Sequence, residues 1–181
     1  MGIRDSAGNQ EMSERYVVFS HGKDSEPWGN KIAAMAELAR NEGFQVESVD
    51  YRGIENPQDR VTRLLSYCKE LRGSLVLVGS SLGGHVSAAA SSLLQARGMF
   101  LLAPAFYMPG FEQHTPKPAN CPITIVHGWR DEIVPVENSF RYAREYKAML
   151  HVIDADHRML DNIRDINYFF EYFLIQMDKY V

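Results

Sequence analysis

Few features of specialised protein classes occur in this 181-residue sequence. It has only two cysteines, Cys68 and Cys121, with no Cys-x-x-C pair and no histidine at metal-ligand spacing, so neither a disulfide framework nor a zinc site is indicated. We expect two buried free thiols. The longest apolar runs, such as 75–78 and 99–103, are too short to cross a bilayer at about 1.5 Å per residue. The sequence therefore does not predict an integral membrane protein.

An excess of basic charge is also missing. The 19 Lys and Arg against 23 Asp and Glu give a net charge of −4, and no basic cluster could neutralise several phosphates, so a nucleic-acid partner is not expected. Hydrophobic residues make up 45% and charged residues 23%, which is typical of a globular protein and excludes a disordered or low-complexity chain. This length fits one domain with its own core.

The amino-terminal residues 1–15, MGIRDSAGNQEMSER, lack the apolar core of a secretory signal. We predict a flexible extension, followed by a folded domain over 16–181, and expect a cytoplasmic protein. Met1, Gly2 and Ser6 have the spacing of an N-myristoylation signal. Because no polybasic segment follows and one acyl chain anchors weakly, we favour an unmodified arm.

From residue 16 onward, β-rich runs alternate with amphipathic stretches, which indicates repeated βα units. The β-rich runs are almost continuously apolar, as in parallel sheets covered by helices on both faces. We therefore predict an α/β fold: three layers around a doubly wound, mostly parallel sheet of about six strands. The predicted strands are 16–20, 44–49, 74–79, 98–102, 123–127 and 148–153. The predicted helices are 29–41, 57–71, 82–97, 136–146 and 161–179.

Two other segments of the predicted domain have distinct compositions. Residues 104–122 carry five of the eight prolines and are predicted to form a long loop, which in a compact domain is usually functional or mobile. The last predicted helix is rich in aromatic residues at helical spacing, so one stripe should pack on the sheet. The remaining Phe169 and Tyr172 are expected either in packing or on the face of a possible homodimer.

A G-x-S-x-G pattern, Gly79 to Gly83, lies between an apolar strand and an Ala-rich helix. Such a strand-to-helix turn, or nucleophile elbow, lifts its central Ser81 on a strained backbone, and only very small residues fit at Gly79 and Gly83. The alternative interpretation is a serine that simply caps the following helix.

A serine hydroxyl is a poor nucleophile, so it needs a base within hydrogen-bond reach and a third group that orients the base. Sites on open α/β sheets form where the strands end. Asp131 follows strand 123–127 and His157 follows strand 148–153, which makes them the candidates. Taken singly, a turn aspartate and a solvated histidine are equally good interpretations. We interpret His21 and His127 as structural, with His21 a minor participant, and His85 and His114 as surface or pocket-rim residues.

Four motifs together resemble the α/β-hydrolases: HGK at 21–23, GSSLGG at 79–84, HGWRDEIVP at 127–135 and DADH at 154–157. In that family the serine, the acid and the histidine follow in the same chain order. The resemblance covers nearly everything after Tyr16. It implies a catalytic triad of Ser81, Asp131 and His157. It also implies an oxyanion hole formed by the amides of Lys23 and Leu82, with Asp24 as the alternative to Lys23.

The chain departs from the larger family members in two ways. The first predicted strand leads directly to the HG motif, so we expect no antiparallel strands before it, and only the proline-rich loop stands where a cap domain would be inserted. It therefore resembles small cap-less serine hydrolases near the carboxylesterase and dienelactone-hydrolase branches. Dienelactone hydrolase has a cysteine at the elbow, where this chain has Ser81, so its substrate is not expected here.

These features predict a serine hydrolase that cleaves an ester or thioester of a small to medium acyl group through an acyl-enzyme. HGKDS follows the first strand in place of a Gly-rich phosphate loop, so neither a nucleotide, a flavin nor a metal cofactor is expected. A thioesterase, lysophospholipase or peptidase would use the same triad, and a non-catalytic binding protein on a hydrolase scaffold is the alternative from another class. Five loop residues are expected to form an apolar acyl pocket: Trp28, Tyr107, Met108, Phe111 and Trp129.

Overall fold

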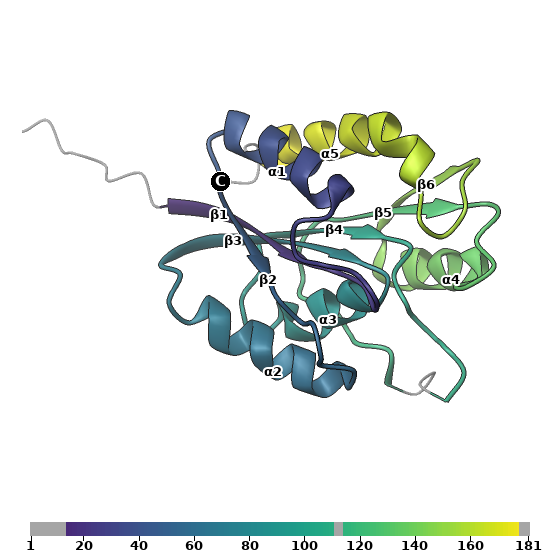
Figure 1. Ribbon diagram of the computed structural model, residues 1–181, viewed down its shortest axis with the longest axis horizontal. Helices are drawn as coiled ribbons and strands as arrows, with labels where there is room; N and C mark the ends of the chain where they lie inside the picture. Colours follow the sequence, from purple (N-terminus) through teal and green to yellow (C-terminus); the bar gives the residue numbers. More distant parts are fainter. Residues whose placement is uncertain (1–13, 111–113, 178–181) are drawn as a thin grey trace, which may run out of the picture.

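The computed structural model describes residues 14–110 and 114–177, and its centre is a parallel sheet (Figure 1). The N-myristoylation pattern at Gly2 and the predicted pocket residue Phe111 lie outside the described residues. The strands of this sheet are β1 (Glu14–Ser20), β2 (Gln45–Val49), β3 (Gly73–Ser80), β4 (Gly98–Leu102), β5 (Ile123–Gly128) and β6 (Met149–Ile153). Their order is β2-β1-β3-β4-β5-β6, so the predicted six-stranded parallel sheet is confirmed.

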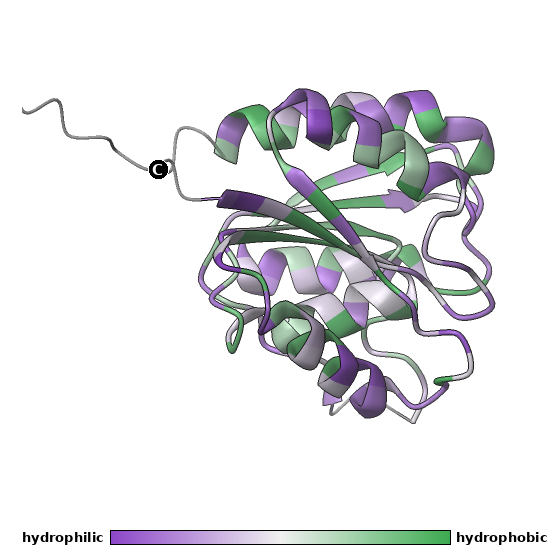
Figure 2. Ribbon diagram, turned by 60° about the vertical axis from the view of Figure 1, so that its left-hand side comes forward, coloured by the Kyte–Doolittle hydropathy of each residue, from purple (hydrophilic) through white to green (hydrophobic). Residues whose placement is uncertain are grey.

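Alternation along the strands sends side chains into two apolar cores. Val17 and Phe19 of β1 belong to the core beneath α1 (Asn30–Asn41) and α5 (Ile163–Met177). Tyr16 and Val18 belong to the other core, which packs against α2 (Pro57–Cys68), α3 (Leu82–Ser91) and α4 (Val136–Tyr146). Figures 1 and 2 show the resulting three layers, with apolar residues on the strands between the two helix layers. The sheet is thus buried on both faces, which explains its nearly continuous apolar strands.

Aromatic rings of α5 fill the core on one face of the sheet. Phe170 lies between Phe100 of β4 and Phe19 of β1, with ring centroids 5.0 Å and 6.3 Å away. Phe173 also contacts Phe100, at 5.6 Å. The aromatic stripe therefore packs on the sheet as predicted. Of the two remaining aromatic residues, Phe169 stacks on His151 of β6 at 4.0 Å, whereas Tyr172 is exposed.

Two helices end earlier than the sequence predicts: α2 ends at Cys68 and not at residue 71, and α3 ends well before residue 97. The Ala-rich pattern predicted a helix through residue 97, but α3 ends at Ser91. Gln95 adopts a left-handed φ of 51°, and the Ala96 amide donates to the Ser91 carbonyl at 3.0 Å, which turns the chain away from the helix axis. Arg97 then donates its amide to Leu75 O of β3 at 2.8 Å, so the chain begins β4 where the sheet requires it.

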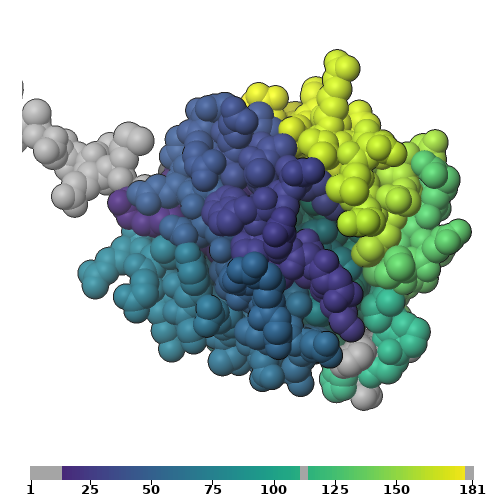
Figure 3. Space-filling view, viewed as in Figure 1, coloured from purple at the N-terminus to yellow at the C-terminus, as the bar shows by residue number. Residues whose placement is uncertain are grey.

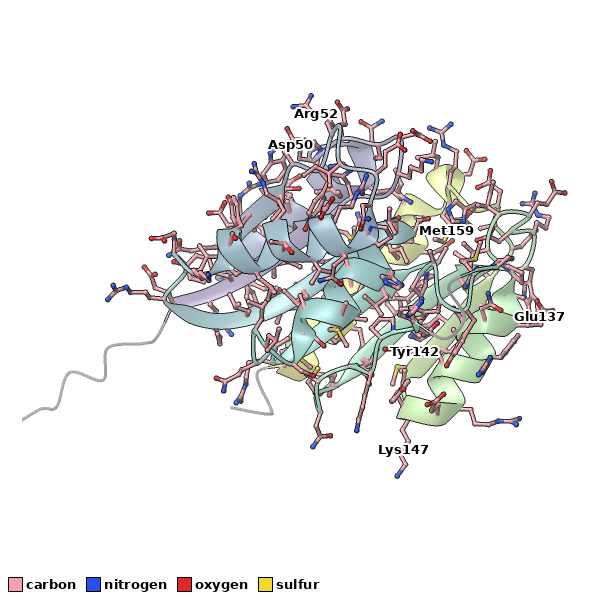
Figure 4. The ribbon with its side chains drawn as sticks, turned by 90° about the horizontal axis from the view of Figure 1, so that it is seen from below. Asp50, Arg52, Glu137, Tyr142, Lys147 and Met159 are labelled. Atoms are coloured by element: carbon pink, nitrogen blue, oxygen red, sulfur yellow. The ribbon has the colours of Figure 1, made fainter. Side chains whose placement is uncertain are left out.

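Residues 104–110 and 114–122 contain no strand or α-helix, as predicted for the proline-rich loop. Tyr142 of α4, labelled in Figure 4, holds this loop on the domain. The ring of Phe106 stacks on Tyr142 at 3.8 Å, and the Tyr142 hydroxyl donates to Pro116 O at 3.0 Å. The described residues between β4 and β5 therefore lie against the domain and form no cap over the carboxyl ends of the strands.

No helix in the described ranges is both long and apolar enough to cross a membrane. Cys68 is buried and Cys121 is half-buried, and both are free thiols. Burial raises the pKa of each to about 11, so little of either thiol is present as the reactive thiolate at neutral pH.

Candidate active site

Ser81 stands on a strained turn between β3 and α3. Its φ of 53° lies in the left-handed region, which costs a non-glycine residue about 1–3 kcal/mol unless neighbours hold it there. Its amide donates to Leu102 O at 2.8 Å, and its carbonyl accepts from the Gly84 and Ala105 amides, both at 3.0 Å. The Ser81 hydroxyl makes no capping bond to α3. The capping interpretation is therefore wrong for its side chain, although Ser81 occupies the N-cap position.

Glycines on both sides of the turn let the backbone segments approach closely. A Cβ atom at Gly79 would lie 2.3 Å from Gly83 O, and one at Gly83 would lie 1.9 Å from Ser20 O. Real Cβ atoms essentially never come closer than 3.0 Å to such an atom. The elbow therefore requires glycine at both positions that the sequence pattern singled out.

A continuous chain of hydrogen bonds joins three loops at the carboxyl end of the sheet. His157 Nε2 lies 3.0 Å from Ser81 Oγ, and His157 Nδ1 lies 2.7 Å from Asp131 Oδ2. Because the carboxylate can only accept, Nδ1 carries the proton and Nε2 is free to accept from the serine hydroxyl. Parallel strands explain how residues 76 positions apart meet, since β3, β5 and β6 all end at this edge.

The Asp131 carboxylate is fully buried and accepts hydrogen bonds at both oxygens. Oδ1 accepts from the amides of Ile133 at 2.9 Å and Val134 at 2.8 Å. Oδ2 accepts from His157 and also from His127 Nε2 at 2.9 Å. Burial raises the pKa of Asp131, but the bond from His157 and the two amide bonds outweigh it, so this pKa lies below its ordinary value. Asp131 thus stays ionised at neutral pH.

His127 is a second imidazole on this carboxylate, a contact that sequence reasoning missed. Its Nε2 also approaches Val134 O at 3.0 Å, so Nε2 carries the proton and Nδ1 accepts from the Ser139 hydroxyl at 2.7 Å. Burial lowers the pKa of His127, which keeps the ring neutral. The prediction of a structural histidine therefore omitted its direct bond to Asp131. The four-residue spacing between His127 and Asp131 was the available signal.

His21 supports the loop that follows β1. Its ring is buried, its Nε2 accepts from the Tyr51 amide at 2.9 Å, and its Nδ1 donates to Gly22 O at 2.9 Å. Burial lowers the pKa of His21, so it too stays neutral. This agrees with the structural role that the sequence suggested.

Two backbone amides expected to face an oxyanion have no acceptor in the described part of the chain. Leu82 is the first residue of α3, so its amide has no partner within the helix. Lys23 and the alternative residue Asp24 both line the cavity beside Ser81, and neither amide forms a backbone bond there. Asp24 has a left-handed φ of 55°, which turns this loop.

Ser81 and His157 line a cavity of about 550 Å³. Figure 3 shows the recess between the purple segment after β1 and the yellow-green segment after β6. Its apolar residues are Ile32, Met35, Leu102 and Leu160, and its basic residues are Lys23, Lys31 and Arg158.

The residues expected to form an apolar acyl pocket do not line this cavity. Trp28 is 47% exposed beside Arg40, and Trp129 is 59% exposed beside Phe140. The hydroxyl of Tyr107 donates to Glu145 at 3.0 Å, and Met108 lies against Asn138 of α4. The cavity is instead lined mainly by the β1–α1 loop, by α1 and by the loop after β6, so these four residues lie outside its lining.

A second cavity, of about 540 Å³, lies between α2 and α3. His85 and His114 line it together with Pro57, Val61 and Ala89, which agrees with the expectation of pocket-rim residues. Burial lowers the pKa of His85.

Other polar residues near the site have separate roles. Asp154 pairs with Arg130 at 2.6 Å, and Asp156 Oδ1 accepts from the Met159 amide at 2.8 Å. Met159, labelled in Figure 4, has a left-handed φ of 51° and turns the chain after His157.

Within residues 14–110 and 114–177, no cluster of three or more His, Cys, Asp or Glu side chains could hold a metal ion.

The chain belongs to the alpha/beta hydrolase family, whose model matches residues 17–174. It is similar to palmitoyl-protein thioesterase ABHD10, mitochondrial, of Mus musculus, with 24% identity over 204 aligned positions that cover 79% of this chain and 69% of the mouse protein. The human protein of the same name is 25% identical and is covered over 67% of its length, again with 79% of this chain.

Solved structures share the fold. A hydrolase of the alpha/beta superfamily from Xanthomonas campestris has a TM-score of 0.83 and 29% identity, covering 91% of this chain and 99% of its own. Est1E from Butyrivibrio proteoclasticus has a TM-score of 0.79 at 18% identity, covering 94% and 90%. A serine hydrolase without lid, also from Xanthomonas campestris, has a TM-score of 0.74 at 18% identity, covering 88% and 80%. Over the residues that the structure describes, the domain is a small α/β-hydrolase without a cap.

Proposed function

We propose that this hydrolase cleaves an ester or thioester by acyl transfer to Ser81 and then to water. One observation carries the proposal: the unbroken hydrogen-bond chain from Ser81 Oγ through His157 to Asp131, mounted on a strained elbow. A serine that merely capped α3 would need neither the left-handed backbone nor a histidine on its hydroxyl. A strained backbone that surrounding contacts hold in place is typical of functional sites.

In the acylation step, Ser81 Oγ attacks the substrate carbonyl carbon while His157 Nε2 takes the hydroxyl proton. The carbonyl π electrons move onto oxygen, and the amides of Leu82 and Lys23, or of Asp24, bind the oxyanion. Each such donor contributes about 3 kcal/mol to the transition state. The tetrahedral intermediate then expels the alcohol or thiol, which receives the proton from His157.

Deacylation repeats these steps with water. His157 accepts a proton from the water as its oxygen attacks the acyl carbon, and then returns a proton to Ser81 Oγ as the acid leaves. Asp131 holds the Nδ1–H tautomer and stabilises the imidazolium that forms twice in each cycle. The buried, four-fold hydrogen-bonded carboxylate suits this role because it stays ionised and cannot rotate freely.

The cavity and the relatives support the ester or thioester class. A volume of about 550 Å³ beside Ser81 suits a small to medium substrate, and the described loop leaves the site open. ABHD10 is named a palmitoyl-protein thioesterase, and a structure of Est1E is described with ferulic acid bound. Both names are consistent with acyl transfer at this fold.

A fluorophosphonate probe and an activated ester test the proposal. The wild type should acquire the label at Ser81 and hydrolyse p-nitrophenyl butyrate, whereas Ser81→Ala should take no label and lose turnover by at least about a thousandfold. Ser92→Ala is the matched control, because Ser92 is an exposed serine just after the same helix.

Full labelling and turnover in Ser81→Ala would refute the mechanism. An unlabelled wild type with no esterase or thioesterase activity would favour a binding protein on a hydrolase scaffold.

A further inference from the structure

Lys31, in the first turn of α1, is a half-buried residue that lines the same cavity as Ser81 and His157. Its Nζ donates to Arg158 O at 2.7 Å. Among residues 14–110 and 114–177, no carboxylate forms an ion pair with it. The charge of Asp156 raises the pKa of Lys31, but Asp156 is an exposed side chain whose Oδ1 already accepts from the Met159 amide. Lys31 is thus a partly desolvated cation without an anionic partner.

Such an arrangement is unfavourable unless something compensates for the lost hydration. Burial lowers the pKa of Lys31 to about 8, the direction expected for a cation that has lost water without gaining a carboxylate. An ammonium has three donors, and the bond to Arg158 O uses one. Two donors remain for a ligand in the cavity.

The position of Lys31 links this cation to the reacting groups. Its acceptor belongs to Arg158, the residue directly after His157, although the two partners are 127 positions apart in the chain. The ammonium is therefore held beside the loop that carries the proposed base. Lys31 and Ser81 line the same cavity, so a substrate bound at Ser81 shares that cavity with this ammonium.

Counting Lys31, the charged side chains that line the cavity are three basic and two acidic. Lys23 and Arg158 join Lys31, against Asp24 and Glu26, in a chain whose net charge is −4. The four other side chains are exposed, so solvent screens them more than Lys31. Lys31 is accordingly the residue best placed to discriminate between charged and neutral ligands.

We propose that this cavity selects substrates that carry an anionic group, a carboxylate or a phosphate, and that Lys31 is the specificity-determining residue that binds it. The inference rests on the proposed hydrolase function. The anion could belong to the acyl part, as in the half-ester of a dicarboxylic acid, or to the leaving group, as in a phosphorylated thiol. A charge-assisted bond from a partly buried ammonium distinguishes these substrates from neutral ones of the same length.

Two substrate pairs test the preference and locate the anion. The first compares p-nitrophenyl hemiglutarate with p-nitrophenyl pentanoate, and the second compares butyryl phosphopantetheine with butyryl pantetheine. The wild type should favour the anionic member of one pair by about tenfold or more in kcat/KM, mainly through KM. A preference in the first pair locates the anion in the acyl part, and one in the second locates it in the leaving group.

Variants at Lys31 test whether this residue binds the anionic group of the substrate. Lys31→Met should bring the ratio of the two kcat/KM values to about unity, and Lys31→Arg should keep most of the preference. Lys69→Met is the matched control because Lys69 is an exposed lysine at the end of α2. A wild type without preference in either pair overturns the proposal. So does a Lys31→Met variant that keeps the preference, or one that loses activity on neutral and anionic substrates equally.

Binding of glutarate and of inorganic phosphate, measured by calorimetry, separates this inference from the proposed function. One of the two anions should bind the wild type at least tenfold more tightly than Lys31→Met, whether or not the protein turns over any ester. Equal binding to both proteins overturns the anion site, whereas anion binding without turnover leaves it standing and contradicts only the hydrolase mechanism.

Discussion

Replacing Gly83 by alanine sets helix propensity against the packing of the elbow. Gly83 lies in the first turn of α3, and propensity alone predicts that alanine there stabilises the protein by about 0.5–1 kcal/mol. The added Cβ would lie 1.9 Å from Ser20 O, 2.6 Å from Ser20 C and 2.8 Å from His21 O. These atoms are backbone at the end of β1, a strand paired on both sides, so they cannot rotate away.

The steric term should outweigh the propensity term. Relieving a contact more than 1 Å too short requires α3 and β1 to separate, and overpacking of this kind costs about 1–3 kcal/mol or more. We therefore expect Gly83→Ala to lower the free energy of unfolding by about 2 kcal/mol. Because the same shift would move the Ser81 turn, turnover of an activated ester should also fall.

Urea unfolding followed by circular dichroism measures this change, with Gly29→Ala as the control. Gly29 precedes α1 with a φ of −60°, and its added Cβ would meet nothing closer than 3.9 Å. Because Gly29 is the N-cap of α1, where glycine is favoured over alanine, the control should lose no more than about 1 kcal/mol. Both variants restrict the unfolded chain alike, so their difference reports the folded state. A Gly83→Ala variant as stable as the wild type would refute the reasoning.

Two further predictions concern the groups behind Ser81. Asp131→Asn should leave His157 in the wrong tautomer and lower kcat on p-nitrophenyl butyrate by about ten-thousandfold, and a loss below tenfold would contradict the role of the carboxylate. Burial lowers the pKa of His21, His85 and His127, so the unfolded chain binds protons more readily than the folded one as the pH falls below about 6.5. The thermal midpoint should therefore fall from pH 7.5 to pH 5.5, and an unchanged midpoint would show that these rings protonate freely in the folded protein.

Local chemistry let the sequence alone predict much of this protein. Apolar runs separated by amphipathic stretches predicted the six strands because both faces of the sheet are covered. The glycines around Ser81 indicated a turn that only very small residues allow. Parallel strands place their carboxyl ends at one edge, so chain order was enough to select Asp131 and His157 as partners.

Contacts between distant segments decided the rest. The end of α3 depends on where β4 must join β3, which no local pattern near Ser91 records. The second donor on Asp131 depends on the buried orientation of His127, and the cavity lining depends on how α1 packs beside the loop after β6. In the sequence, Lys31 is an ordinary lysine of a predicted helix, and only the fold brings its Nζ within hydrogen-bond distance of Arg158 O. Side-chain direction and desolvation arise only when the layers pack, so the sequence determined the fold and its reactive positions, whereas tertiary structure decided the shape and charge of the site.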